Sequence, residues 1–143
     1  MTFEKELICD LDKIIDISKI YIEKSNDKYF ANLAKIFPVL GSKINWKKVP
    51  ESIEEDVQSD DFLSQIIFFK KICEKFNLSE ECIVIGDSAI DIAMLMSIDV
   101  LNLCLMKIIE IPQHLYVVSK DYSWCFSFTM EGNMAFGFSN RSR

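Results

Sequence analysis

The clearest pattern in the chain is an alternation of bulky and small side chains near its C-terminal end. Aromatic residues occupy every second position of residues 122–129, and serine, cysteine and threonine stand between them. Residues 134–139 repeat the alternation. A period of two is what a β-strand with two unlike faces requires, and the glycine-containing segment 131–133 is typical of a turn. The two segments therefore predict a β-hairpin with one aromatic face and one face of small side chains.

Hydrophobic residues spaced three and four apart predict helices in the first half of the chain. The first helix is expected over about Phe3 to Lys24. A second begins after Asn26, which can cap it, and ends before Gly41. The third, with Ser59 as the expected cap, carries an apolar stripe that runs from Phe62 to Phe76.

The second half of the chain mixes both kinds of element. Cys82–Ile85 is a short β-branched run that predicts a buried strand. Residues 88–96 fit either a short helix or a second strand. Ser97 starts a predicted helix that ends at Pro112, and residues 115–118 predict the strand that precedes the hairpin.

Helices first and antiparallel strands last predict an α+β fold, in which the helices pack on one face of a small, mostly antiparallel sheet. The 143 residues fit a single domain, mainly helical over residues 1–78 and mixed over residues 82–139. We expect the helices to cover the aromatic face of the hairpin. Its small face is then exposed to water, covered by a nearby helix, or open to a partner as a flat surface or an edge strand.

The formal charge of −6 narrows the possible functions. A nucleic-acid binder needs a basic surface to replace phosphate counterions, whereas an acidic chain suits a basic protein partner. The five cysteines are scattered without a C-x-x-C pair, which predicts reduced, buried thiols. With a single histidine, the chain has no zinc-ligand spacing. No signal peptide or membrane span is predicted, so we expect a cytoplasmic protein.

The most one-sided segment is residues 51–61, in which six of eleven residues are acidic. One interpretation is a solvated helical turn that places favourable charge at the start of the next helix. The other is a docking patch for a basic protein. The candidate contact residues for such a patch are Glu54, Glu55, Asp56, Asp60 and Asp61, with Trp46 as the first candidate for an exposed aromatic anchor.

Two short motifs raise an enzymatic alternative. Residues 9–12 and 83–91 resemble the first and last acidic motifs of haloacid-dehalogenase-type phosphatases. The resemblance implies that Asp10 is the nucleophile and Asp12 the acid/base. It also implies that Asp87 and Asp91 help to bind magnesium. However, residues 9–12 fit a helix, on which the first two carboxylates diverge by about 200°, and an antiparallel hairpin does not finish a parallel sheet. We therefore predict no catalytic, cofactor-binding or metal-binding residue and keep the phosphatase as the alternative function.

His114 is the only imidazole, so any Ser-His or Cys-His chemistry would have to use it. Cys125 and Ser123 are close to it in sequence, but no acid is clearly placed to orient the ring. We expect His114 to fix a corner of the fold by a hydrogen bond.

The last third of the chain resembles a known family. Segments 111–119 (IPQHLYVVS), 123–125 (SWC) and 131–137 (EGNMAFG) resemble the ends of small bacterial immunity proteins that accompany polymorphic toxins, including those of contact-dependent growth inhibition systems. The resemblance implies a cytoplasmic protein that binds a cognate toxin domain, often a basic nuclease, and neutralises it without catalytic residues or a cofactor. Acidic charge suits such a role because it steers association with a basic partner.

Overall fold

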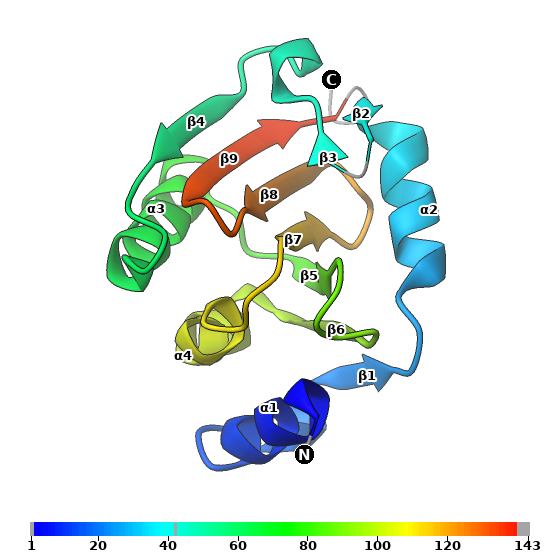
Figure 1. The fold of residues 1–143 in the computed structure, drawn as a ribbon, viewed down its shortest axis with the longest axis vertical. Coiled ribbons are helices and arrows are strands. Elements are labelled where there is room, and N and C mark those ends of the chain that lie inside the picture. The colour runs from blue at the N-terminus through cyan, green and yellow to red at the C-terminus, as the bar shows by residue number, and fades with distance from the viewer. Residues whose placement is uncertain (1, 42, 140–143) are drawn as a thin grey trace.

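A computed structural model describes residues 2–41 and 43–139 of the chain. These residues form one seven-stranded sheet in which every neighbouring pair of strands is antiparallel, with the order β1-β6-β5-β7-β8-β9-β4 (Figure 1). The strands are β1 (Tyr21–Glu23), β4 (Ile53–Asp56), β5 (Glu81–Gly86), β6 (Ala93–Ser97), β7 (Leu115–Ser119), β8 (Trp124–Phe128) and β9 (Asn133–Phe138). The predicted α+β class and the predicted hairpin of β8 and β9 are confirmed.

Helical segments lie on both faces of the sheet. The helices are α1 (Phe3–Asp12), α2 (Asp27–Ile36), α3 (Phe62–Lys75) and α4 (Ile98–Ile109), with 3-10 turns η1 (Ile17–Lys19) and η2 (Trp46–Lys48). A separate two-stranded hairpin joins β2 (Val39–Leu40) to β3 (Lys43–Ile44). None of the helices in the described ranges is long and apolar enough to cross a membrane.

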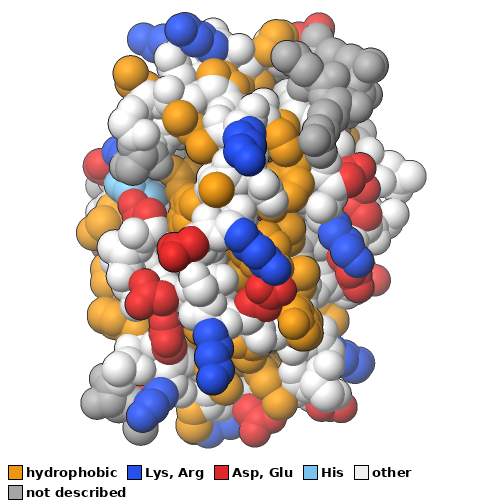
Figure 2. Space-filling view, turned by 90° about the vertical axis from the view of Figure 1, so that its right-hand side faces the viewer, with side chains coloured by type: hydrophobic (Ala, Val, Ile, Leu, Met, Phe, Trp, Pro, Cys, Tyr) orange, Lys and Arg blue, Asp and Glu red, His pale blue; other side chains and the backbone are white. Residues whose placement is uncertain are grey.

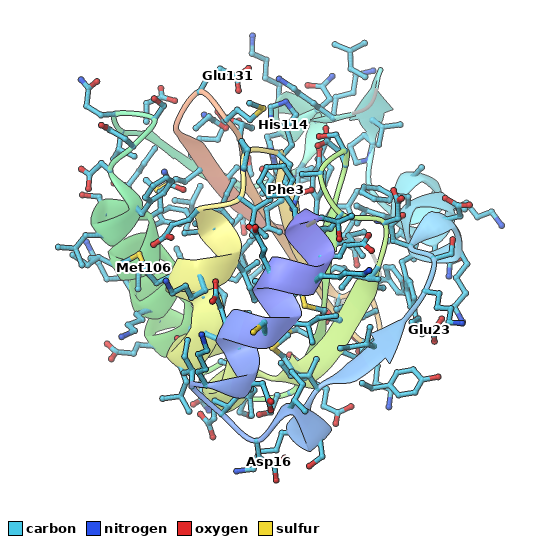
Figure 3. The ribbon with its side chains drawn as sticks, turned by 60° about the horizontal axis from the view of Figure 1, so that its bottom comes forward. Phe3, Asp16, Glu23, Met106, His114 and Glu131 are labelled. Atoms are coloured by element: carbon cyan, nitrogen blue, oxygen red, sulfur yellow. The ribbon has the colours of Figure 1, made fainter. Side chains whose placement is uncertain are left out.

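The first face of the sheet is covered by α1, α3 and α4, which lie side by side in Figure 3. Trp124, Phe126, Phe128 and Phe136 of the hairpin point into this layer and are almost completely buried, and Phe138 is partly buried. Tyr122, which precedes β8 with a φ of 62°, packs on the second face instead. Phe126 lies at its centre, with its ring 4.7 Å from that of Phe69 and 6.2 Å from that of Phe68, both on α3. The expectation that helices cover the aromatic face is confirmed.

The second face is covered by α2, by η2 and by Val49 just after η2. The indole Nε1 of Trp46 donates to the Ser127 hydroxyl over 2.9 Å, so the small side chains of the hairpin form a seat for a bulky ring. At Gly137 a Cβ would lie only 2.7 Å from Val49 Cγ1 and 3.0 Å from Trp46 Cζ3. The small face is therefore covered, and the alternative of an open flat surface is wrong. The hairpin is not an edge either, because β4 pairs with β9.

Two strands of the seven-stranded sheet, as well as the short β2 and β3, arise where the sequence predicts none. The first helix ends at Asp12, after which Asp16 accepts a hydrogen bond from the backbone of Ser18 and starts the 3-10 turn. The following β1 pairs with β6 and so becomes one edge of the sheet. Residues 53–56 likewise pair with β9 and become the other edge. The predicted helix over Phe3–Lys24 is wrong in its second half because pairing with a distant strand outweighs a local helical pattern.

The remaining elements largely agree with the sequence pattern. Residues 93–97 form a strand, which decides the ambiguous segment 88–96 in favour of a strand for its last part. Ser97 caps α4 as predicted, with its hydroxyl accepting from the Val100 backbone N–H. The third helix also forms, but Asp61 caps it in place of Ser59.

Candidate protein-binding surface

The acidic segment forms an exposed strand at the edge of the sheet. Ile53 packs against the core on the first face, while Glu54, Glu55 and Asp56 are exposed to solvent. Pairing with β9 holds the strand in place, with Glu54 opposite Ala135 and Asp56 opposite Asn133. The helical-turn interpretation of this segment is therefore wrong over residues 53–56, and three carboxylates are displayed from one fixed strand.

The carboxylates of β4 are not neutralised by the rest of the described chain. Ion pairs formed by the residues in these ranges involve neither Glu54 nor Glu55 nor Asp60. Asp56 accepts one hydrogen bond, from the side-chain amide of Asn133 over 3.0 Å, which is a neutral partner. Exposed carboxylates that form no ion pair make the electrostatic potential around them more negative. They therefore make this corner of the molecule more acidic, although Lys71 and Lys75 line the groove beside Glu55.

Asp61 belongs to the helix more than to the surface. Its carboxylate accepts from the Ser64 backbone N–H over 3.0 Å and from the Ser64 hydroxyl over 2.7 Å. These two bonds hold the pKa of Asp61 below its usual value. The residue predicted to contact a partner therefore serves as the N-cap of α3, although its charge still adds to the negative corner.

Trp46 is not an exposed anchor. Its side chain is 6 % exposed and lies between the sheet and Phe37, with ring centroids 6.3 Å apart. The lysines near Trp46 in the sequence suggest an exposed loop. In the structure, however, the indole fills the space left by the small residues of β8 and β9. The expectation that Trp46 is an exposed aromatic is wrong, because its burial and its bond to Ser127 stabilise the second face.

A groove of about 530 Å³ runs between β4 and α3. Ile53 and Glu55 line it from the strand, and Phe68 and Ile72 line it from the helix. The two apolar helix residues are almost fully buried and expose little surface, so the groove combines apolar and charged lining. Its rim on α3 carries charged side chains of both signs, which are Lys71, Glu74 and Lys75.

A second cavity, of about 330 Å³, lies on the other side of the molecule between α2, the β2–β3 hairpin and the sheet. Its walls are mainly apolar, with Phe30 and Tyr116 in edge-to-face contact 5.8 Å apart, and Asp87 is its single carboxylate. Figure 2 shows this side of the molecule, where acidic and basic side chains are interspersed. The surface around α2 therefore carries charges of both signs.

The four aspartates of the phosphatase alternative are not brought together. Asp10 lines a groove between α1 and α4 next to Lys107, whereas Asp87 borders the cavity beside α2. The backbone N–H of Asp91 donates to the Glu4 carboxylate of α1. Across the ranges that the structure describes, no three His, Cys, Asp or Glu side chains are grouped as metal ligands would be. The geometry thus offers no shared site for a nucleophile and a magnesium-binding pair.

His114 is engaged at a corner of the fold. Its Nδ1 accepts from the Met130 backbone N–H over 3.1 Å and lies 3.9 Å from a Glu131 carboxylate oxygen, the pair labelled in Figure 3. The His114 backbone N–H donates to Asp87 over 3.0 Å. The hydrogen-bonded corner role predicted for this histidine is confirmed.

The sequence patterns did not predict a buried polar cluster that lies next to this corner. The Gln113 amide oxygen accepts from the backbone N–H groups of Ala89 and Ile90, and Asn26 donates to the Gly86 carbonyl over 3.0 Å. A Cβ on residue 86 would collide with the Gln113 amide, which would then have to leave its bonds to Ala89 and Ile90. The cluster holds the β5–β6 connection in place. Its only sequence signal is a Gly next to an otherwise β-branched strand.

The cysteines carry no disulfide. Four of them are buried as predicted, and Cys9 on α1 is exposed, contrary to the prediction. Burial raises the pKa of Cys73 to about 12 and that of Cys104 to about 11, and it also raises the pKa values of Cys82 and Cys125. The buried thiols therefore stay protonated at neutral pH and behave as small hydrophobic side chains.

Of the six predicted contact residues, the structure gathers Glu54, Glu55 and Asp56 on one exposed strand, leaves Asp60 exposed just before α3, uses Asp61 as a cap and buries Trp46. Comparisons of the chain with protein-family models, with curated proteins and with solved structures found no match. Any function assigned to the chain therefore rests on its own residues.

Proposed function

We propose that the chain is an immunity-type inhibitor, which binds a cognate toxin domain in the bacterial cytoplasm and neutralises it by protein–protein contact without catalysing a reaction. The observation that carries this proposal is the display of unpaired carboxylates on edge strand β4, with Glu54 and Glu55 exposed and outside every ion pair of the described residues. A basic partner can pair with these carboxylates without first breaking an ion pair inside the protein, so binding costs no such interaction.

Charge complementarity favours this kind of partner. A toxin domain that cleaves nucleic acid needs basic residues around its active site to hold phosphates. An acidic surface steers such a domain into contact, raising the association rate and disfavouring acidic competitors. Bound there, the inhibitor denies the nucleic acid access to the same basic residues.

Strand pairing and a helix cap hold the surface in place, which supports a binding role. The strand β4 is fixed by its pairing with β9 along Ile53–Asp56, and Asp60 directly precedes the α3 cap. Little conformational entropy is lost when a preorganised surface binds, so more of the interaction energy contributes to affinity.

The experiment is co-expression of the chain with the toxic C-terminal domain of a secreted protein encoded beside it, with growth and co-purification as readouts. The test variant carries Glu54→Lys, Glu55→Lys and Asp60→Lys. The control carries Glu6→Lys, Asp12→Lys and Glu110→Lys, which are exposed acids on α1 and at the end of α4 and give the same change in net charge. Unfolding midpoints of both variants establish that each is folded.

We expect the wild type and the control to restore growth and to co-purify with the toxin domain, and the test variant to do neither. The association rate of the wild type should fall as salt is added, because screening acts on exposed charges. Equal protection by both variants would remove the β4 surface from the interface. Failure of the wild type to bind or protect against that domain would contradict the function itself.

A further inference from the structure

We propose that the open edge of β4 binds an extended segment of the partner as an eighth strand of the sheet, in which alternate side chains are basic and apolar. This inference rests on the proposed function for its physiological partner, but the recognition mode can be tested separately. It goes beyond charge attraction because it assigns the backbone of β4 a direct part in binding.

The direction of the backbone groups follows from the hydrogen-bond pattern around β9. The backbone N–H of Val57 donates to Gly132 O, and that of Thr129 donates to Asn133 O, which points Asn133 towards β8. Successive residues of an antiparallel strand point their N–H and C=O groups to opposite sides. Ile53 and Glu55 therefore bond to β9, and the backbone groups of Glu54 and Asp56 face the open edge.

The two faces of this edge differ in chemistry, and the difference specifies the incoming strand. Side chains that enter on the first face meet the groove, in which Ile53, Phe68 and Ile72 supply apolar surface and two acids, Glu55 and Glu74, are balanced by two lysines, Lys71 and Lys75. Side chains that enter on the second face lie beside the carboxylates of Glu54 and Asp56, which point away from the groove by the alternation of the strand. The best complement is a strand with apolar residues on its first face and lysine or arginine on its second.

A second copy of this chain is a poor occupant. Pairing two β4 strands would set Glu54 and Asp56 of one copy against acids of the other, and like charges directly opposite each other destabilise a strand pair. Charged side chains also protect edge strands from self-association. The same carboxylates that disfavour a copy of the chain favour a basic segment, so the edge selects its partner by charge.

The opposite edge of the sheet lacks these features. Strand β1 has three residues, and its acid, Glu23, accepts from Tyr29 Oη over 2.7 Å and pairs with Lys28 Nζ at 3.0 Å. These bonds lower the pKa of Glu23 and neutralise its charge. A basic strand therefore gains less there than at β4.

The first experiment separates the backbone of residue 54 from its charge. Glu54→Gln removes the carboxylate and keeps the outward N–H, whereas Glu54→Pro removes both. Proline is tolerated on an edge strand where its missing N–H faces solvent, and equal unfolding midpoints check that both variants fold. We expect binding of the toxin domain to be about fivefold to tenfold weaker for Glu54→Pro than for Glu54→Gln, the effect of one lost hydrogen bond. Equal affinities of the two variants overturn the strand-addition mode.

The second experiment needs no toxin. The probe is a synthetic nine-residue peptide in which lysine and valine alternate, and the control peptide has the same composition with lysines and valines in separate blocks. Amide hydrogen exchange of the full chain is followed residue by residue with each peptide. We expect the alternating peptide to slow exchange at Glu54 and Asp56, and the block peptide to leave these two amides unprotected.

Equal protection by both peptides means that charge alone binds them, and it overturns the proposal, as does an absence of protection by the alternating peptide. Protection at these amides without rescue from any toxin leaves the recognition mode standing and contradicts the immunity function. Rescue from a toxin without protection of these amides supports the immunity function and overturns the strand-addition mode. If Glu54→Pro does not fold, the exchange experiment on the wild type decides alone.

Discussion

The two faces of the sheet are stabilised in different ways. On the first face, Phe126 and its aromatic neighbours bury large apolar surfaces against three helices. On the second, small side chains make room for Trp46, whose indole is placed by a directed hydrogen bond to Ser127. Burial of apolar area has no preferred direction, whereas a hydrogen bond in a close-fitting seat requires one geometry. The first face should therefore be sensitive to lost volume, and the second to added volume and to lost hydrogen-bond partners.

The largest effect is expected for Phe126→Ala. Removing a buried phenyl ring costs about 3–5 kcal/mol of the free energy of unfolding, because the contact energy is lost and a cavity remains. Urea unfolding measures it. The control is Cys125→Ala at the neighbouring position. The Cys125 side chain packs on the second face, and this substitution removes only its sulfur atom. Equal destabilisation by the two substitutions would contradict the difference between the faces.

On the second face, Trp46→Phe should lower the free energy of unfolding by about 1–3 kcal/mol, because the Ser127 hydroxyl loses its donor inside the core. The same substitution in a Ser127→Ala background should cost less, since no polar group is then left unpaired. The double-mutant cycle from urea unfolding gives the coupling between the two side chains. Additive effects would mean that the indole stabilises this face by its volume alone.

Added volume tests the second face from the other side. Gly137→Ala places a methyl group against Val49 and Trp46, and we expect a loss of about 1–2 kcal/mol, because both contacts are with side-chain atoms that can shift. Combining it with Val49→Ala should cost less than the sum of the two single substitutions. Thermal unfolding of the three variants checks this. An unchanged free energy of unfolding for Gly137→Ala would show that there is free space between residue 137, Val49 and Trp46.

The smallest effect on stability is expected at low pH, from the carboxylate of Asp61 at the start of α3. The hydroxyl and backbone N–H of Ser64 hold the pKa of Asp61 below its unfolded value of about 3.9. A group whose folded pKa is lowered stabilises the fold above the unfolded pKa, and this contribution is lost as pH falls through the folded pKa. Urea unfolding between pH 7 and pH 3 should therefore show a shallower acid decline for Asp61→Asn. An unchanged decline would assign the acid sensitivity to other carboxylates.

Elements with strong local patterns were predictable from the sequence, and elements decided by distant partners were not. The hairpin, α3 and α4 each carry a clear periodicity within one segment, and the buried strands β5 and β7 are short apolar runs. The strand identity of β1 depends on β6, and that of β4 on β9, so a three- or four-residue segment contains too little information. An acid-rich stretch in particular contradicts the average composition of strands.

The candidate surface was predicted in part. The acids of residues 54–56 do lie on one exposed strand, but the alternation of the strand points Glu55 to the first face and Glu54 and Asp56 to the second. The burial of Trp46 was missed because its partner Ser127 is 81 residues away. A signal was available in the hairpin, where serine, cysteine, alanine and glycine on one face leave room for a bulky side chain from elsewhere in the chain.

The order of the strands has a consequence for how the chain is synthesised. Strand β4 emerges from the ribosome well before β9, the strand with which Ile53 is paired to Phe136. Until β9 is made, β4 lacks both the centre of the sheet and the edge position that displays Glu54. Such late, long-range pairing slows folding. The edge position of the acidic strand therefore exists only once β9 has been made, and a chain truncated before β9 would lose it.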